Sequence, residues 1–316
     1  MKTVLILLRD IEERHKAKLE AAAPGCRLVY AGHDTVTPEE MQGADIIIGN
    51  PDPRMLSQYG KPEFLQIETA GADAYTAPGV LEAGTVLACA VGAYNVAVAE
   101  HAFALTLMLQ KKLHLYRDEQ HKALWRDRGP VSTLSSGTVL VVGLGNIGRH
   151  YAGLVKAMGA RVIGVKRTVE TCPPCADEVV TVAELDRVLP EADVIMSVLP
   201  DTAETRRLYT PERFGRMKDS AIFINCGRGS AVSSETLYQA LKERKIAAAG
   251  IDVADPEPLP KDSPLWELEN LVITPHISGG HHLPVTVERI VDIAAENLTA
   301  FLKGGPLRNV VEHTGA

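Results

Sequence analysis

Short apolar runs alternate with amphipathic stretches in the first part of the chain. The runs are bounded by turn residues and lie at 2–8, 26–30, 44–50, 64–69 and 86–90. Helices are expected between them, and Thr37, Pro38 and Glu40 form a capping box with proline at the first helical position. Continuous apolar runs separated by helices indicate a parallel sheet that is covered on both faces.

The stretch 95–126 predicts one long helix, apolar in its first half and polar in its second. A second alternating series follows it, with six apolar runs at 137–143, 161–165, 192–200, 220–226, 247–253 and 270–276. Six strands match a complete doubly wound unit. The amphipathic segment 283–304 predicts a last helix, which we expect to return to the first domain because the second sheet is already full. The pattern therefore predicts two α/β domains, with the helix at 95–126 crossing between them.

Composition narrows the function without naming it. The 316 residues are 46% hydrophobic and 23% charged, and the formal net charge of −7 gives no reason to expect a nucleic-acid partner. The first apolar run is too short for a signal peptide, and Glu100 and His101 interrupt the longest apolar stretch, so no membrane segment is expected. Five scattered cysteines predict reduced thiols and a cytoplasmic location. A small metabolite is the expected partner.

The segment GLGNIG follows an apolar run and opens a helical stretch. This strand–loop–helix context makes G-x-G-x-x-G a dinucleotide-binding fingerprint. Gly143 permits the tight turn, Gly145 lets the backbone approach a pyrophosphate, and Gly148 allows close packing of helix on strand. The backbone N–H groups around Asn146 and Ile147 are expected to face the anion. A tight turn without a ligand is the weaker interpretation.

The end of the next predicted strand departs from the pattern of an NAD site. There an acidic residue is expected, which bonds the ribose hydroxyls. Lys166, Arg167 and Thr168 occupy this place, and Lys166 lies 23 residues after Gly143 (166 − 143). Two cations and a hydroxyl suit a ribose 2′-phosphate, which a guanidinium binds through two parallel hydrogen bonds. The sequence favours NADP(H), with NAD(H) still open, and a solvated basic turn is the alternative.

Three residues stand just after predicted strands, at the edge where ligands of open α/β sheets bind. They are Arg228, Glu257 and His276. Reduction of a ketone by hydride needs an acid to protonate the developing alkoxide, and imidazole, which titrates near neutral pH, suits that role. A neighbouring carboxylate would hold the imidazole, and an arginine would bind and polarise a 2-oxo acid.

Over nearly its whole length the chain resembles the D-isomer-specific 2-hydroxyacid dehydrogenase family. The resemblance is carried by GLGNIG, DVIMSVLPDTAETR, NCGRGS, DVADPEPLP, LVITPHISG and AAENLTAFLKGGPLRNVV, and by the order of Arg228, Glu257 and His276. It implies that His276 is the acid/base, Glu257 its partner and Arg228 the substrate anchor. It also implies a flavodoxin-like substrate domain at 1–96 and 284–316, an inserted Rossmann domain at 97–283 that binds the dinucleotide, and a cleft between them.

Other positions carry over from the same resemblance. The stretch TAGAD places Ala70, Gly71 and Ala72 in the loop whose amides hold the substrate carboxylate. Asn95 and His101 belong to the start of the crossing helix, where a structural role is expected rather than a catalytic one. Contacts with the dinucleotide are implied for Leu199, Pro200, Cys226 and Asp252, although Cys226 is also interpreted as a packed residue beside Arg228.

The basic stretch 166–168 resembles the NADPH-preferring branch, which includes glyoxylate and hydroxypyruvate reductases. We therefore expect reduction of small 2-oxo acids to D-2-hydroxy acids. The chain lacks the additional C-terminal domain of many phosphoglycerate dehydrogenases, which disfavours but does not exclude phosphoglycerate or another bulkier substrate with NAD. A dinucleotide-sensing interaction protein is the third alternative, and the intact triad argues against it. The apolar breadth of the helix at 95–126 predicts a homodimer.

The remaining cysteines, histidines and tryptophan give weaker indications of function. Cys172 and Cys175 form a lone C-x-x-C pair, so no zinc is expected and an ordinary loop is favoured over a redox disulfide. Trp266 is expected to anchor the loop before the last strand, and the two histidines at 281–282 to lie on the surface. The sequence does not name the side chain of the substrate; its pocket is expected among the loops around 50–54, 70–75 and 281–284.

Overall fold

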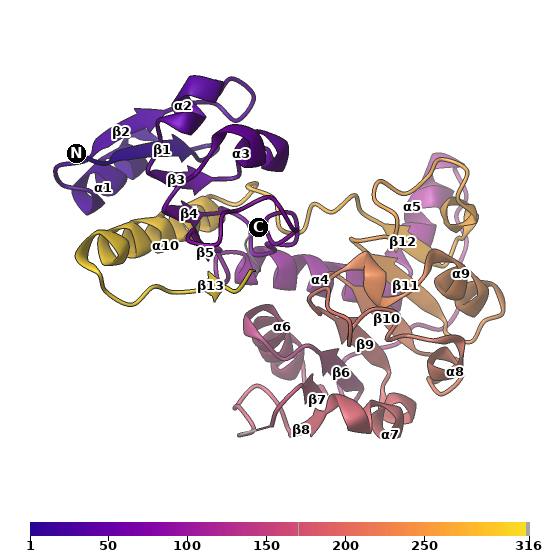
Figure 1. The fold of residues 1–316 in the computed structure, drawn as a ribbon. Helices are drawn as coiled ribbons and strands as arrows, with labels where there is room; N and C mark the ends of the chain where they lie inside the picture. The colour runs from indigo at the N-terminus through magenta and orange to yellow at the C-terminus, as the bar shows by residue number, and fades with distance from the viewer. Residues whose placement is uncertain (170, 314–316) are drawn as a thin grey trace. The chain divides into compact units, whose positions relative to one another are not determined.

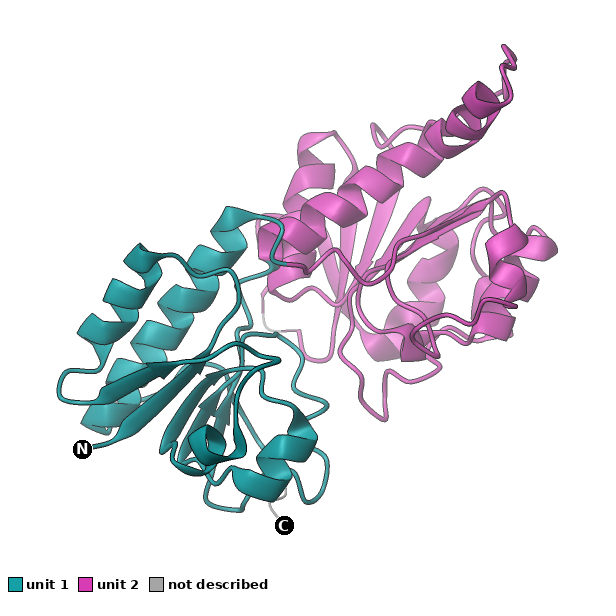
Figure 2. Ribbon diagram, turned by 90° about the horizontal axis from the view of Figure 1, so that it is seen from above, with its two compact units in different colours: residues 1–94, 281–316 teal, residues 95–280 magenta. Residues whose placement is uncertain are grey.

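The computed structural model describes residues 1–169 and 171–313, which fold into two compact units. Unit 1 is made of residues 1–94 and 281–316, and unit 2 of residues 95–280 (Figure 2). Each unit is an α/β domain built on a mostly parallel sheet, which confirms the fold class predicted from the sequence. The chain changes unit after residues 94 and 280, whereas the sequence analysis placed the changes after residues 96 and 283.

Within the described residues, the sheet of unit 1 has six strands in the order β13-β5-β4-β3-β1-β2 (Figure 1). They are β1 (Thr3–Leu7), β2 (Arg27–Tyr30), β3 (Ile46–Gly49), β4 (Phe64–Gln66), β5 (Val86–Ala88) and β13 (Val310–Val311). Only the short edge strand β13 runs antiparallel to its neighbour; the other pairs are parallel. The helices are α1 (Glu13–Ala22), α2 (Pro38–Gln42), α3 (Pro53–Tyr59) and α10 (Pro284–Lys303).

Local signals account for the helix ends of unit 1. The predicted capping box is present, because Thr37 accepts a hydrogen bond from the backbone of Glu40 and the Glu40 carboxylate accepts one from the backbone of Thr37. The sequence analysis did not name α3, although Asp52 caps it and Pro53 is its first residue. The last helix, α10, ends where Gly304 adopts a left-handed conformation, as its sequence predicted.

The core of unit 1 explains why α10 belongs there. α10 packs on α1 and on β4, and Figure 1 shows the two helices side by side. The rings of Phe64 on β4 and Phe301 on α10 stack with their centroids 4.9 Å apart. Asn297 on α10 donates a hydrogen bond of 2.6 Å to the buried Gln66 side chain, so a polar contact supplements the apolar packing.

Unit 2 has a sheet of seven strands in its described residues, in the order β12-β11-β10-β9-β6-β7-β8, all parallel. They are β6 (Thr138–Val142), β7 (Arg161–Lys166), β8 (Glu178–Thr181), β9 (Val194–Ser197), β10 (Ile222–Asn225), β11 (Ala248–Ile251) and β12 (Leu271–Ile273). The prediction of six strands was therefore short by one. The missed strand, β8, lies at the edge of the sheet, where only Val180 of its four residues is buried, so it carries no apolar run.

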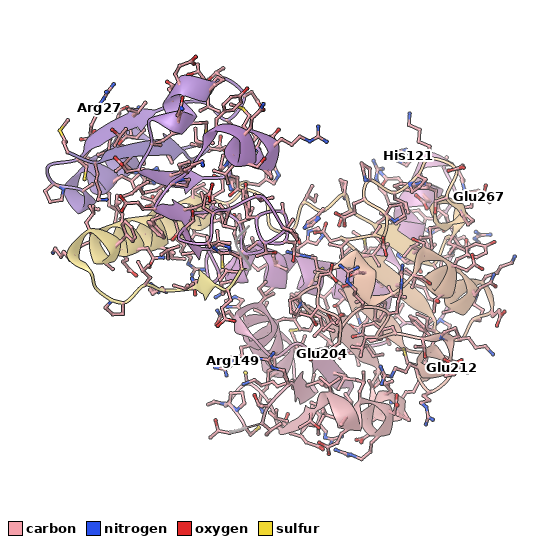
Figure 3. All side chains as sticks on the ribbon, in the orientation of Figure 1. Arg27, His121, Arg149, Glu204, Glu212 and Glu267 are labelled. Atoms are coloured by element: carbon pink, nitrogen blue, oxygen red, sulfur yellow. The ribbon has the colours of Figure 1, made fainter. Side chains whose placement is uncertain are left out.

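The helices of unit 2 are α4 (Asn95–Gln110), α5 (Leu113–His121), α6 (Asn146–Ala157), α7 (Leu185–Val188), α8 (Pro211–Phe214) and α9 (Ser234–Lys242). Short 3-10 helices are η1 (Val182–Glu184), η2 (Leu189–Glu191), η3 (Gly229–Ala231) and η4 (Pro264–Glu267). Charged side chains such as Arg149 and Glu212 extend from the outside of this unit (Figure 3). The largest fully buried side chains in its core include Tyr151, Tyr209, Phe214 and Phe223.

The prediction of one helix over 95–126 was wrong. The helix breaks after Gln110, because Lys112 takes a left-handed conformation with φ of 56°, and α5 ends at His121. The segment 128–132 forms hydrogen bonds with the residues at the end of α4. The Ser132 N–H donates to the Gln110 carbonyl, and the Lys112 ammonium donates to the Arg128 carbonyl. These contacts join residues that are remote in sequence, so the pattern of apolar residues at 95–126 could not predict where the helix breaks.

Two further findings concern the whole described chain. Among residues 1–169 and 171–313 no helix is long and apolar enough to cross a membrane. In the same ranges no three His, Cys, Asp or Glu side chains group closely enough to hold a metal ion.

Candidate active site

The candidate residues of unit 2 lie on loops that leave the same edge of its sheet. All seven strands are parallel, so the loops after β6, β7, β9, β10, β11 and β12 start at their carboxyl ends. Arg228 follows β10, Glu257 follows β11 and His276 follows β12, and these three strands are neighbours. The topology thus brings the predicted triad to one side of the sheet edge and the glycine loop to its centre.

The glycine loop between β6 and α6 is packed as the fingerprint predicts. Gly143 has φ of 103°, a conformation that favours glycine, and a Cβ there would lie 2.6 Å from the Val198 carbonyl oxygen. A Cβ on Gly148 would lie 2.2 Å from the Gly143 carbonyl oxygen, so helix and loop touch there. At Gly145, by contrast, a Cβ would meet nothing within 4 Å, which leaves the backbone open to a ligand.

The N-terminus of α6 faces this open part of the loop. The helix begins at Asn146, followed by Ile147, and its N-cap is Gly145, which supplies no side-chain cap. The first N–H groups of a helix have no partner within the helix, and together with the helix dipole they attract an anion. The loop therefore has the shape and polarity of a pyrophosphate site.

Lys166 is the last residue of β7 and is half-buried, whereas Arg167 and Thr168 are exposed just beyond it. In the described part of the chain no hydrogen bond or ion pair engages any of these three side chains. Two cations and a hydroxyl are thus available at the strand end next to β6, where the ribose of a bound dinucleotide is expected.

The loop after β9 lies against the loop after β10. A Cβ on Gly227 would lie 2.5 Å from the Leu199 backbone nitrogen, so the two loops are in direct contact. Leu199 is buried and Pro200 is exposed. Cys226 is buried too, and burial raises the pKa of its thiol, with the charge of Asp252 adding to the effect. The thiol therefore stays protonated and packs as an apolar group.

Glu257 and His276 form a hydrogen-bonded pair. The distance from His276 Nδ1 to Glu257 Oε2 is 2.8 Å, and the other carboxylate oxygen of Glu257 accepts a bond of 2.9 Å from the Ala254 N–H. The carboxylate is thus fixed by the backbone before it holds the imidazole. Both side chains remain partly exposed, at 38% for Glu257 and 49% for His276, so the imidazole can reach a ligand through Nε2. This is the arrangement that a general acid/base histidine requires.

The turn that carries His276 is built around the carboxylate of Asp252. Asp252 is 1% exposed and accepts hydrogen bonds from the backbone N–H groups of Ile277 and Ser278 and from the Thr274 hydroxyl. His276 itself has φ of 51°, in the left-handed region, and its N–H donates to the Asp252 carbonyl at 2.8 Å. Asp252 therefore acts on the position of His276. Its predicted contact with the dinucleotide stays a prediction.

Thr274 and His101 complete this network, and the sequence analysis gave Thr274 no role. The Thr274 hydroxyl bonds Asp252 Oδ1 at 2.5 Å and lies 3.0 Å from His101 Nε2. His101 stands on α4, so the network ties that helix to the loop of His276. The segment TPH places Thr274 two residues before the histidine, but the sequence has no signal that pairs it with a residue 173 positions away.

The Arg228 guanidinium donates a hydrogen bond of 3.0 Å to the Gly227 carbonyl, and the Asn225 side chain fixes the backbone of the same loop. The Asn225 side chain donates to the Arg228 carbonyl at 3.1 Å and accepts from the Gly227 N–H at 3.1 Å. A Cβ on Gly229 would lie 1.8 Å from the Ala254 carbonyl oxygen, so this loop packs directly on the loop that leads to Glu257. The Arg228 side chain is half-buried.

A cavity of about 410 Å³ lies beside the histidine–glutamate pair, within unit 2. Its apolar walls come from Val253, Leu259, Ile273 and Trp266. The Trp266 indole donates a hydrogen bond of 2.8 Å to the Pro260 carbonyl, so it anchors the loop between β11 and β12.

The predicted carboxylate loop belongs to unit 1. Ala70, Gly71 and Ala72 follow β4 and are half-buried. The Thr69 hydroxyl donates to the Gly71 carbonyl at 2.9 Å, and the Ala72 carbonyl accepts from two later N–H groups, so the turn is defined. The structure thus assigns these residues to one unit and the triad with the glycine loop to the other.

Comparison with known proteins decides the family. Residues 103–278 match the family model described as "D-isomer specific 2-hydroxyacid dehydrogenase, NAD binding domain". This match covers more than half of the chain and includes the glycine loop and all three triad positions. The chain belongs to the D-isomer-specific 2-hydroxyacid dehydrogenase family.

Relatives within this family differ in substrate. The chain is 31% identical to the glyoxylate reductase of Korarchaeum cryptofilum over 98% of this chain and 96% of that protein. It is 33% identical to the D-3-phosphoglycerate dehydrogenase of Synechocystis sp. over 78% of this chain, but spans only 44% of that protein. An NADPH-dependent glyoxylate/hydroxypyruvate reductase from Sinorhizobium meliloti, solved with NADP and sulfate, has a TM-score of 0.82 and 25% identity, covering 99% of this chain and 98% of that one.

The prediction that the chain is an NAD(P)-dependent enzyme of the 2-hydroxyacid dehydrogenase family is thereby confirmed. The residues present fit a dinucleotide: the approach at Gly145 is open, the uncapped helix follows it, and Lys166 and Arg167 are available beyond β7. The five cysteines, including Cys172 and Cys175, are free thiols.

Proposed function

We propose that this dehydrogenase reduces small 2-oxo acids of the glyoxylate and hydroxypyruvate type to D-2-hydroxy acids, with NADPH as the preferred reductant. The observation that carries the proposal is the 2.8 Å bond between His276 Nδ1 and Glu257. It presents Nε2 of an oriented imidazole on the same sheet edge as the dinucleotide loop.

Each residue of the proposed site has a distinct task. When bound, the dinucleotide supplies a hydride to the keto carbon. His276 donates a proton from Nε2 to the keto oxygen, and Glu257 stabilises the charged imidazole before that transfer. Arg228 binds the substrate carboxylate and polarises the carbonyl, and the amides of 70–72 are proposed to hold the same carboxylate.

The preference for NADPH rests on residues 166–168. A 2′-phosphate next to Lys166 and Arg167 gains charge-assisted hydrogen bonds that a free 2′-hydroxyl cannot make. The Sinorhizobium meliloti relative, named as NADPH-dependent, supports this proposal.

A substrate panel tests the function. We expect the purified protein to oxidise NADPH with glyoxylate or hydroxypyruvate, and to do so faster than with 3-phosphohydroxypyruvate at equal concentration. The measurement is the loss of absorbance of the reduced nicotinamide, run in parallel with NADH. The Synechocystis relative favours a phosphorylated substrate as the second candidate. Fastest turnover of 3-phosphohydroxypyruvate with NADH would establish that candidate, and no turnover of any 2-oxo acid would refute the proposal.

We also propose a homodimer. The segment 113–131 leaves the core of unit 2 and exposes large apolar side chains, with Leu113 at 53%, Leu124 at 49% and Trp125 fully exposed. A second copy of the chain would cover this surface, because a closed symmetric pair buries the same patch on both partners.

We also propose that the protein works in the reducing cytoplasm, and its free thiols support this proposal.

Replacing the exposed tryptophan should weaken that dimer. An interface tryptophan typically contributes about 2 kcal/mol or more. A symmetric dimer loses this side chain from both partners, about 4 kcal/mol in all, so Trp125→Ser is expected to raise the dimer dissociation constant by roughly 10³-fold. Sedimentation equilibrium over a range of concentrations measures this. The control is Trp266→Phe, which changes the other tryptophan. A wild-type protein that sediments as a monomer at micromolar concentration contradicts the proposal.

A further inference from the structure

The sheet of unit 1 has a ligand-binding edge of its own. Its strand order β2-β1-β3-β4-β5 reverses direction between β1 and β3, and in such sheets ligands bind outside the carboxyl ends of the strands at that point. Arg9 follows β1, Asn50 follows β3, and Glu68 follows β4 (Figure 1 shows the three strands side by side). Glu68 also directly precedes the turn that is proposed to hold the substrate carboxylate.

Glu68 is a buried carboxylate with little to bind it. Its side chain is 4% exposed, yet its contacts are long: 3.4 Å to the Arg9 N–H and 3.7 Å to the Arg9 Nε. Charge-assisted hydrogen bonds are typically about 2.7–2.9 Å long. Among the residues that the structure describes, no side-chain donor lies within hydrogen-bond distance of this carboxylate. Oε2 accepts the long bond from the Arg9 N–H, whereas Oε1 has only the ion pair with Arg9 and is not fully enclosed, so a ligand can reach Oε1 and supply a hydrogen bond to it.

The backbone around Glu68 is fixed, so the side chain is held in place. The Glu68 N–H donates to the Asn50 side chain at 2.9 Å, and its carbonyl accepts from the Tyr94 hydroxyl at 2.6 Å. The Asn50 amide also donates to the Thr69 hydroxyl, which bonds the Gly71 carbonyl. The same bonds therefore position both Glu68 and the carboxylate turn.

The charges around Glu68 nearly balance. Burial raises the pKa of the Glu68 carboxyl, while the charges of His281, Arg9 and His33 oppose this rise. The tyrosines at 75 and 94 are buried nearby, and Asp10 lies 3.5 Å from the His281 ring. Each of the three basic side chains has an acidic neighbour, because Arg9 contacts Glu68, His281 contacts Asp10, and His33 contacts Asp34. This edge therefore has no strong excess of positive charge for a second anionic group of the substrate.

A hydroxyl group is the ligand chemistry that fits these observations. A hydroxyl both donates and accepts, so it can pair with a carboxyl in either protonation state. A methyl group would leave Oε1 of Glu68 without a hydrogen bond, and an anion would be repelled by the carboxylate when it is ionised. Because Glu68 lies next to the proposed carboxylate turn, the hydroxyl must be close to the substrate carboxylate.

We propose that Glu68 is a specificity residue that hydrogen-bonds a hydroxyl on the third carbon of the 2-oxo acid. This inference rests on the proposed function and names its substrate class as 3-hydroxy-2-oxo acids. Arg9 and Asn50 border the same place, and neither residue nor Glu68 belongs to the catalytic set.

Hydroxypyruvate and pyruvate test this, because they differ only in that hydroxyl. We expect kcat/KM of the wild type to be at least about tenfold higher for hydroxypyruvate, since leaving a buried polar group unpaired carries a penalty of roughly that size. Glu68→Leu should bring the ratio close to one, and Glu68→Gln should retain most of the preference because an amide still bonds a hydroxyl. The matched control is Glu63→Gln, which changes an exposed glutamate just before β4, ion-paired with Lys2.

The outcomes separate this inference from the proposed function. No turnover of any 2-oxo acid would overturn both. If the wild type turns over both substrates with nearly equal kcat/KM for hydroxypyruvate and pyruvate, the role of Glu68 alone is overturned. This measurement needs no variant, so the test stands even if Glu68→Leu fails to fold. A tenfold preference that Glu68→Leu leaves unchanged also overturns it, as does a preference for oxaloacetate or 3-phosphohydroxypyruvate, which would assign the edge to an anionic group.

Discussion

Replacing His276 by alanine is expected to lower kcat for 2-oxo acid reduction by about 10²–10⁴-fold, the usual contribution of a positioned general acid. The proton donor disappears, while the glycine loop that holds the dinucleotide is untouched. NADPH should therefore bind His276→Ala as tightly as it binds the wild type. Steady-state kinetics with the best 2-oxo acid, together with a fluorescence titration of NADPH, measures both effects.

His150→Ala serves as the control for this variant, because it removes an exposed histidine of the same unit, on α6. It should keep full activity.

A second pair of variants examines the glutamate that bonds His276. Glu257→Gln should lose a large part of kcat, whereas Glu267→Gln, on the outside of the unit, should not (Figure 3). Full turnover by His276→Ala would show that another group supplies the proton.

Replacing Arg167 by alanine is expected to raise KM for NADPH relative to KM for NADH by roughly ten- to hundredfold. The reason is the loss of charge-assisted hydrogen bonds to the 2′-phosphate, which are worth about 1.5–3 kcal/mol each. KM for NADH should change little, because a free 2′-hydroxyl has no charge for the guanidinium to bind. Measuring kcat and KM with both dinucleotides at a saturating 2-oxo acid gives the ratio directly.

The matched control for Arg167 is Arg216→Ala, which removes an exposed arginine before β10, at the opposite end of the strands of the same sheet. Lys166→Ala should give a smaller change than Arg167→Ala, because Lys166 is half-buried at the end of its strand. If Arg167→Ala raises both KM values equally, or neither, then residues 166–168 do not select the phosphate. The solvated basic turn would then be the better interpretation.

Local patterns predicted most elements of the fold. The apolar runs became strands because a parallel sheet covered on both faces buries both sides of its strands, so most strand positions are apolar. The capping box at Thr37 and the end of α10 at Gly304 were confirmed for the same kind of reason: each needs only a few neighbouring residues. The edge strand β8 was not predicted because only one of its four residues is buried, so it carries no apolar run. The break at Lys112 was not predicted because backbone groups remote in sequence bond the end of α4.

The candidate site divides in the same way. The glycine loop and the basic stretch could be named from motifs because each is defined by residue type and short spacing. The triad could be named because its three residues follow predicted strands, in the order that the resemblance to the family implies. The network of His101, Thr274 and Asp252 could not, since it joins α4 to two loops of the sheet edge. Glu68 is a comparable case: its burial and its poor pairing with Arg9, 59 residues away, are properties of the folded unit.

The sequence by itself determined that this chain has two α/β domains, a dinucleotide loop, a basic strand end and an arginine–glutamate–histidine set. These follow from periodicity and from motifs, which are local in the chain. Only the tertiary structure decided that the Asp252 carboxylate shapes the histidine turn and that Glu68 is buried with only long contacts to Arg9. The physical reason is that hydrogen bonding and burial depend on which strand ends meet at one edge of a sheet, and residues far apart in the chain supply them.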